Sequence, residues 1–178
     1  MRFFTSDLHF GHRPIIEFCD RPYWNLEDMK NDLIKNINDV VKPSDLLYIL
    51  GDFSFLPKDN NVEIVKSINC PVVLIRGNHD HSGRIKGVGF ADVHDELDIQ
   101  LGSHIVTMSH YPFRGDHTAI ERYLDRRPKD VGQWLLHGHT HSKERINRAE
   151  RMIHVGVDAW NYGPISEADV LGMISSES

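Results

Sequence analysis

Residues 46–52 read Leu-Leu-Tyr-Ile-Leu-Gly-Asp, a continuous apolar run that ends on a glycine and a carboxylate. The pattern returns at residues 71–80, where Pro-Val-Val-Leu-Ile precedes Arg-Gly-Asn-His-Asp. Continuous apolar runs of this length predict strands that are buried on both faces, as in a parallel sheet covered by helices. Ligands of such sheets collect in the crevice beyond the carboxyl ends of the strands, which is where these polar residues fall.

Three other polar clusters also follow short apolar runs. They are Asp7-Leu8-His9, Ser109-His110 and Gly138-His139-Thr140-His141. In an extended segment, residues i and i+2 share one side, so Asp7 with His9 and His139 with His141 are expected to form ligand pairs. Aspartate, asparagine and histidine supply oxygen and nitrogen ligands to divalent metals. The clusters together hold too many ligands for one tetrahedral ion, which indicates two metals that share a bridging carboxylate.

Each cluster alone also has a plainer interpretation. Gly51-Asp52 fits a turn after a strand, and residues 77–80 fit a polar loop. His110 alone fits a buried histidine whose hydrogen bonds are satisfied within the protein. The metal interpretation therefore depends on the clusters occurring together, each at the end of an apolar strand.

The remaining pattern predicts an α/β fold. Helices are expected from Pro14 to Asp20, from an N-cap at Asn25 to about Val41, and from Val62 to Ile68. Gly102-Ser103 predicts a hairpin turn. Strands are expected at Arg2–Ser6, Leu46–Leu50, Pro71–Ile75, Val93–Leu101, His104–Met108, Trp134–Leu136 and Met152–Val157. In the first half, strands alternate with helices, as in parallel strands with helical crossovers.

Length and composition predict a single domain over residues 1–178. The net charge is −6, so bulk attraction to nucleic acid is not expected, and duplex nucleic acid is not an expected partner. Cys19 and Cys70 form no C-x-x-C motif, which favours reduced thiols and a cytoplasmic location. No apolar stretch is long enough to span a membrane, so no membrane partner is expected.

Taken in order, the five clusters resemble those of the calcineurin-like metallophosphoesterases, and the matching blocks run from Asp7 to His141. The resemblance implies a four-layer αββα sandwich, in which two mixed β-sheets pack face to face between helices and hold a dinuclear metal site at their strand ends. It also implies the metal ligands. One ion would take Asp7, His9 and His141, the other Asn78, His110 and His139, and Asp52 would bridge the two.

The implied activity is hydrolysis of a phosphoester by a hydroxide that bridges the two metals. Asn78 would help to stabilise the transition state, and His79 would protonate the leaving oxygen. Asp80 would orient His79 or the nearby backbone, and its spacing does not decide between these. Substrate phosphate would meet His12, Arg13, Arg76 or Arg114, although each also fits a surface or structural role.

One departure narrows the substrate. In the phosphoprotein phosphatase branch, Gly-Asp is followed by Asp-Arg-Gly, whereas Gly51-Asp52 continues as Phe-Ser-Phe-Leu. The chain therefore resembles the small bacterial or viral type of phosphoesterase. We expect a cytoplasmic enzyme that hydrolyses a small, nucleotide-type phosphodiester with two Mn²⁺ ions, with Zn²⁺, Fe or Ni²⁺ as alternatives. The other functions considered are a phosphomonoesterase acting on a nucleotide or sugar phosphate, and a non-catalytic interaction module on the same fold.

Overall fold

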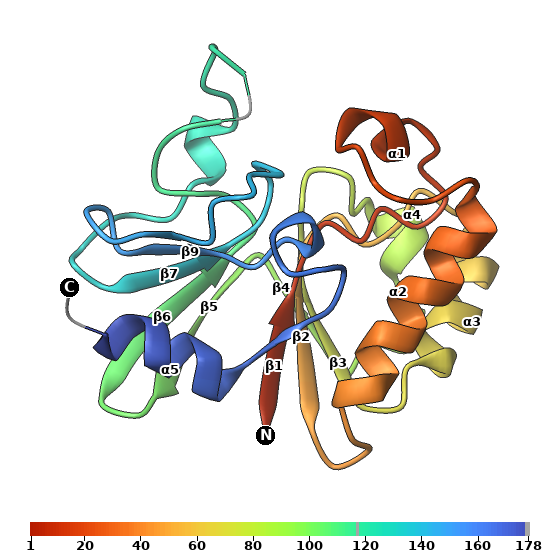
Figure 1. The fold of residues 1–178 in the computed structure, drawn as a ribbon, viewed down its shortest axis with the longest axis horizontal. Helices are drawn as coiled ribbons and strands as arrows, with labels where there is room; N and C mark the ends of the chain where they lie inside the picture. Colours follow the sequence, from red (N-terminus) through yellow and green to blue (C-terminus); the bar gives the residue numbers. More distant parts are fainter. Residues whose placement is uncertain (117, 177–178) are drawn as a thin grey trace.

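The computed structural model describes residues 1–116 and 118–176 and contains two five-stranded mixed sheets that lie face to face (Figure 1). The strand order is β10-β1-β2-β3-β4 in the first sheet and β5-β6-β7-β9-β8 in the second. This is the predicted α/β sandwich of two mixed sheets with helices outside. No helix in the described part of the chain is both long and apolar enough to cross a bilayer.

The first sheet is built mainly from the N-terminal half of the chain. Its central strands run parallel, and only the short β10 (Ile165–Ser166) pairs antiparallel with β1. Its other strands are β1 (Arg2–Thr5), β2 (Leu46–Leu50), β3 (Val72–Ile75) and β4 (Asp92–His94). The helices of this half are α1 (Pro14–Phe18), α2 (Leu26–Val40), α3 (Lys58–Ser67) and the single turn α4 (Ser82–Ile85). Figure 1 shows α2 and α3 along one side of this sheet.

The second sheet comes from the C-terminal half. Strands β6, β7 and β9 run parallel, while β5 and β8 are antiparallel at the two edges. The strands are β5 (Glu96–Leu101), β6 (His104–Ser109), β7 (Trp134–His137), β8 (Ile146–Asn147) and β9 (Met152–His154). Two 3₁₀ turns, η1 (Leu124–Arg126) and η2 (Val157–Ala159), and the final helix α5 (Glu167–Ser175) complete this half.

Side chains of β2 alternate between two separate cores. Leu47 and Ile49 face the helices and pack with Met29 and Leu33 of α2. Tyr48 and Leu50 face the other sheet and join the cluster between the sheets, which includes Val106, Met108, Leu136 and Ile153. Burial on both faces explains why β2 is apolar along its whole length.

The predicted elements are largely confirmed, although α3 begins at Lys58 and not at Val62, and β9 ends at His154 and not at Val157. Asn25 caps α2, because its side chain accepts hydrogen bonds from the backbone N–H groups of Glu27 and Asp28. The strand predicted at Val93–Leu101 is wrong, because the chain leaves the first sheet after β4 and enters the second at β5. Period-two alternation continues through this crossing, so the pattern of apolar residues does not reveal a change of sheet.

Candidate metal centre

The predicted ligand clusters meet at one edge of the sandwich. They follow β1, β2 and β3 of the first sheet and β6 and β7 of the second, so both sheets contribute to one site. Parallel strands place their carboxyl ends together, which gathers residues that are far apart in sequence. The residues brought together are Asp7, His9, Asp52, Asn78, His110, His139 and His141.

The first ligand set consists of Asp7, His9 and His141. Ligand atoms of these three residues lie within 4.8 Å of one another. His9 is 2% exposed, and neither of its ring nitrogens has a hydrogen-bond partner within the protein. Burial lowers the pKa of His9, so its imidazole is neutral and has a nitrogen lone pair to offer. A buried, neutral imidazole beside a carboxylate fits a metal ligand, because a bound cation would satisfy both.

The second set consists of Asn78, His110 and His139. Asn78 Oδ1 lies 3.1 Å from His110 Nε2 and 3.1 Å from His139 Nδ1. His110 Nδ1 lies 2.8 Å from the carbonyl oxygen of Leu50, which can only accept, so the proton of a neutral His110 sits on Nδ1. Its Nε2 then directs a lone pair towards Asn78 Oδ1. Two facing acceptors repel each other unless a cation lies between them, so this geometry also fits a metal site.

Asp52 lies between the two sets. Its Oδ2 is 3.5 Å from His9 Nε2 of the first set and 3.5 Å from His110 Nε2 of the second. Its Oδ1 accepts a hydrogen bond from the backbone N–H of His79 at 3.0 Å, which fixes the carboxylate plane. Burial raises the pKa of Asp52 to about 6. Oδ2 is therefore close to a histidine of each set, which is compatible with a bridging role.

The ligand residues have an unusual backbone conformation, which corrects part of the sequence reasoning. Asp7, His9, Asp52, His139 and His141 all have positive φ, between 50° and 69°. The paired ligands therefore do not lie on one side of an extended strand, as the i, i+2 argument assumed. Left-handed conformations cost free energy in residues other than glycine and cluster at functional sites. Here they occur at five of the seven candidate ligands.

Gly51 and Asp80 hold the Asp52 loop in place. Gly51 has φ of 88°, and a Cβ atom at this position would overlap the His110 ring, so only glycine fits. Asp80 is buried, and its carboxylate accepts hydrogen bonds from the backbone N–H groups of Asp52, Phe53 and Gly77. The sequence left open whether Asp80 orients His79 or backbone, and the structure shows backbone hydrogen bonds.

Sequence reasoning missed the residues that hold His141. Asp158 Oδ2 lies 2.9 Å from His141 Nδ1, which directs Nε2 towards the metal centre. Arg21 holds Asp158 in turn through two hydrogen bonds, and it also donates to the carbonyl oxygens of Asp7 and Leu8. The side chains of Arg21 and Asp158 are 0% and 1% exposed. Carboxylates that bind a ligand histidine in this way fix its tautomer and raise its basicity.

Replacing Asp158 by asparagine is expected to weaken metal binding about 10- to 100-fold, because His141 loses its charged acceptor. The same change leaves the buried guanidinium of Arg21 unpaired, which should destabilise the fold by about 3–5 kcal/mol. Metal titration and thermal unfolding measure the two effects. Asp92→Asn is the matched control, since Asp92 pairs with His94 on the surface. Equal metal affinity in the two variants would contradict the role of Asp158.

Asp116 contacts His139, the other candidate ligand of the loop that carries His141. Its Oδ1 lies 3.4 Å from His139 Nε2, on the opposite side of the ring from Asn78. Arg122 donates to both carboxylate oxygens of Asp116. Asp116 follows no strand directly, so no sequence signal related it to His139. Asp158, by contrast, follows the apolar run of β9, the same signal that marked the other acids.

His79 lies beside Asp52 and outside both candidate ligand sets. Its Nε2 is 3.9 Å from Asp52 Oδ2, and its side chain is 39% exposed. Burial, with the nearby His12 and His110, lowers the pKa of His79 to about 4. At neutral pH the ring is therefore uncharged in the protein alone. The Phe55 ring contacts both imidazoles, with its centroid 4.1 Å from that of His12 and 4.5 Å from that of His79, and both imidazoles lie near the ring of His9.

The three predicted substrate arginines lie in different surroundings. Arg13 is exposed and donates to the carbonyl oxygen of Trp24. Arg76 pairs with Asp95 at 2.6 Å. Arg114 is 67% exposed and lines a separate cavity next to the centre. Of the predicted substrate residues, His12 is the one with a ring contact to a metal ligand, His9.

Metal binding is expected to release protons. Burial alone would lower the pKa of His141, but Asp7 and the hydrogen bond to Asp158 raise it to about 11. His141 is then protonated at neutral pH without metal, and a metal bound at Nε2 must displace that proton. Mn²⁺ affinity should rise roughly tenfold per pH unit between pH 7 and 9. It should fall more steeply below pH 6, where Asp52 also becomes protonated. Calorimetry in buffers of different ionisation enthalpy measures the number of protons released. A Mn²⁺ affinity that does not change with pH would contradict the assignment of His141 as a metal ligand.

Comparisons with known proteins agree with this geometry. Residues 3–166 match the family model described as the calcineurin-like phosphoesterase superfamily domain. An uncharacterised protein of Methanocaldococcus jannaschii is 32% identical over 172 residues, which cover 92% of this chain and 85% of that protein. The gene 66 protein of Mycobacterium phage L5 is 35% identical, with coverages of 88% and 86%.

A solved structure shows the same fold. The protein of unknown function from Aquifex aeolicus superposes with a TM-score of 0.81 at 30% identity, and the match covers 97% of this chain and 98% of that one. The family supports a metal-dependent phosphoesterase, and the Asp/His cluster supplies suitable metal ligands. The family model covers most of the sequence, and the chain therefore belongs to the calcineurin-like phosphoesterase superfamily.

Proposed function

We propose that this protein is a dinuclear metal-dependent phosphodiesterase that acts on a small, nucleotide-type substrate and uses Mn²⁺. The observation that carries the proposal is the position of Asp52 Oδ2, 3.5 Å from a histidine nitrogen of each ligand set. A single carboxylate oxygen in that position can bind two ions at once.

The proposed division of the ligands is the one that the resemblance to the superfamily implies, and the distances around Asn78 support it. Asp7, His9 and His141 would hold one ion, Asn78, His110 and His139 the other, and Asp52 both. When bound, two divalent ions supply a nucleophilic hydroxide at neutral pH and neutralise the charge on the phosphoryl oxygens. Ligands of mixed oxygen and nitrogen type suit Mn²⁺ and also Zn²⁺, Fe and Ni²⁺, so Mn²⁺ is the metal that we propose to test first.

The chain's own residues orient the substrate and assist the leaving group. Asn78 directs Oδ1 to the ligand histidines, and its amide N–H groups would donate to a phosphoryl oxygen. His79 reaches the edge of the site from a partly exposed position. A bound anionic phosphoester would raise the low pKa of His79, which would let it donate a proton to the leaving oxygen.

The proposed substrate is small for two reasons. The net charge of −6 does not favour duplex nucleic acid, and Gly51-Asp52 is not followed by the Asp-Arg-Gly of the phosphoprotein phosphatases. A diester is favoured over a monoester because an acid such as His79 helps most when the leaving group is a poor alkoxide. Cys19 and Cys70 are free thiols, which favours a reducing, cytoplasmic setting.

A paired assay tests the proposal. Metal is removed by chelation, Mn²⁺ is restored, and turnover of bis(4-nitrophenyl) phosphate is compared with that of 4-nitrophenyl phosphate. The diester should be hydrolysed with the higher kcat/KM, and chelation should abolish both reactions. A higher kcat/KM for the monoester would favour the phosphomonoesterase alternative. No turnover of either substrate with any of the four metals would contradict a catalytic function.

A further inference from the structure

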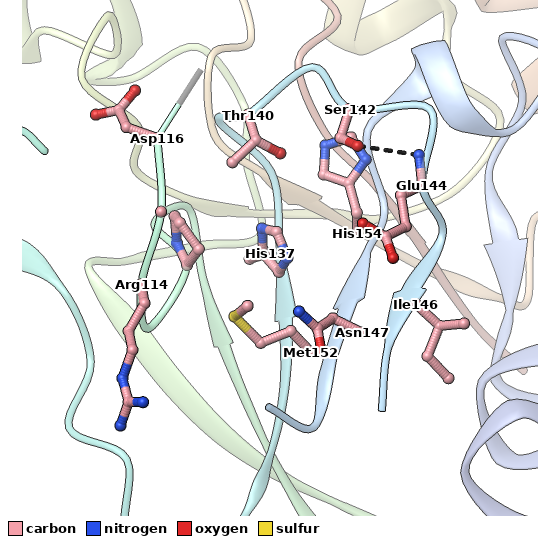
Figure 2. Close-up of a pocket in the computed structure, with 12 residues that line it drawn as sticks. Arg114, Asp116, His137, Thr140, Ser142, Glu144, Ile146, Asn147, Met152 and His154 are labelled. Atoms are coloured by element: carbon pink, nitrogen blue, oxygen red, sulfur yellow. Dashed lines mark hydrogen bonds between the residues drawn. The ribbon is translucent and has the colours of Figure 1, made fainter. Parts of the chain in front are cut away.

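A second cavity of about 230 Å³ lies next to the metal-ligand loop formed by residues 138–141. It sits at the carboxyl ends of β7 and β9, which run parallel and whose last residues, His137 and His154, are register partners. Figure 2 shows residues of the 112–116 segment on one side and residues of the 140–147 segment on the other, with His137 between them. In this kind of sheet, the carboxyl edge is the place where ligands bind.

Two buried imidazoles form the inner wall of this cavity. His137 and His154 are 5% and 3% exposed, and their ring centroids are 5.3 Å apart. His137 Nδ1 lies 2.9 Å from the carbonyl oxygen of Gly138, so a neutral His137 is protonated there and offers Nε2 as an acceptor. Neither ring nitrogen of His154 has a hydrogen-bond partner within the protein. Because both nitrogens of His154 are buried from solvent, a ligand in the cavity would meet His137 and the other polar lining groups and not these nitrogens.

The rest of the lining combines apolar side chains with other hydrogen-bonding groups. Met152 and Ile146 contribute apolar surface, while Asn147 and Glu144 contribute an amide and a carboxylate. Pockets for planar ligands have this composition, with apolar contacts to the ring faces and a few polar groups at the ring edge. At about 230 Å³ the space is below the roughly 300–1,000 Å³ of drug-sized pockets, so it suits a single ring system.

The charges around the cavity argue against an anion. Asp116 and Glu144 are both carboxylates, whereas Arg114 is the one cation among the lining residues that the structure describes. An anionic group would therefore meet two like charges. A neutral ring with N–H donors would find acceptors in Glu144 and in Nε2 of His137.

The cavity is close enough to the metal centre to hold another part of the same substrate. Thr140 lines it and stands between the ligands His139 and His141. Asp116 also lines it, and its Oδ1 lies 3.4 Å from His139 Nε2. The cavity thus borders the loop that carries two of the candidate metal ligands.

We infer that this cavity binds the nucleobase of a nucleotide-type phosphodiester, with His137, Asn147 and Glu144 reading its edge. The inference rests on the proposed function, since it assigns the organic part of the substrate while the metal centre takes the phosphoryl group. A free nucleoside should occupy the same cavity and compete with substrate.

The test uses the full-length, Mn²⁺-loaded protein and the four ribonucleosides. At least one nucleoside should inhibit hydrolysis of bis(4-nitrophenyl) phosphate competitively. Glu144→Gln, at an exposed position, should raise the inhibition constant of that nucleoside roughly three- to tenfold, which is the effect of one lost hydrogen bond, and should leave the KM of the aryl diester unchanged. His94→Asn, a surface histidine outside both sites, should change neither constant.

Calorimetric titration of each nucleoside needs no turnover, so the cavity is tested even if the aryl diester is not hydrolysed. In that case, nucleoside binding that becomes weaker in the Glu144→Gln variant would support the cavity assignment. The absence of turnover would then count against the proposed function alone. No binding of any of the four nucleosides would overturn the inference. Noncompetitive inhibition would overturn it too, because the nucleoside would then occupy a site separate from that of the substrate.

Discussion

Replacing Asp52 by asparagine is expected to lower the bound metal from two ions to at most one per chain and to reduce turnover by a factor on the order of 10³. Asp52 is the residue whose oxygen faces both ligand sets, at 3.5 Å from His9 and from His110. Asparagine keeps the shape of the side chain and can still accept the hydrogen bond from the His79 backbone. It removes the negative charge that would offset two divalent ions in a buried site.

Metal content by mass spectrometry and steady-state kinetics measure the two effects. Asp92→Asn, which removes an exposed carboxylate beside His94, is the control and should retain both ions and full activity. Two ions still bound to the Asp52→Asn protein would show that Asp52 is not the bridge. Full activity with a single ion would show that hydrolysis does not need the pair.

Replacing His79 by alanine is expected to leave metal binding intact and to reduce hydrolysis of alkyl diesters by about 10²–10⁴, the usual contribution of a general acid. His79 lies outside both ligand sets, and its imidazole is 3.9 Å from Asp52 Oδ2. An aryloxide leaves without protonation, whereas an alkoxide does not. The loss should therefore be much smaller for bis(4-nitrophenyl) phosphate, which expels an aryloxide, than for a dialkyl phosphodiester, which must expel an alkoxide.

The comparison of leaving groups separates proton donation from a structural effect, which would reduce both rates equally. Metal content measured alongside should equal that of the parent protein. His104→Ala, at the start of β6 and remote from the centre, is the control and should leave both rates unchanged. An equal loss on both diesters would remove the proposed role of His79 as proton donor.

The sequence predicted the parts of the site that depend on strand ends. Asp52 could be placed because five apolar residues before it predict a buried strand, and the carboxyl ends of parallel strands converge. The same reasoning brought Asn78, His110 and His139 to the same edge of the sandwich. Their grouping into two ligand sets came from the resemblance to the superfamily, and the distances around Asn78 agree with that grouping.

Other features depend on tertiary contacts that no local pattern encodes. Asp116 contacts His139, and Arg21 contacts Asp158. Neither residue directly follows an apolar strand, so the strand-end signal does not mark them. The left-handed backbone conformation of Asp7 and His9 could not be predicted from the sequence, because neither aspartate nor histidine strongly favours it. The crossing from β4 to β5 escaped prediction because alternation continues across it.

Electron paramagnetic resonance during a Mn²⁺ titration tests the bridged pair most directly. The metal-free protein should bind two equivalents, and the second should produce the spectrum of two exchange-coupled Mn²⁺ ions, because Asp52 Oδ2 faces both ligand sets. Saturation at one equivalent, or two equivalents with the spectrum of isolated Mn²⁺, would contradict a dinuclear centre bridged by Asp52.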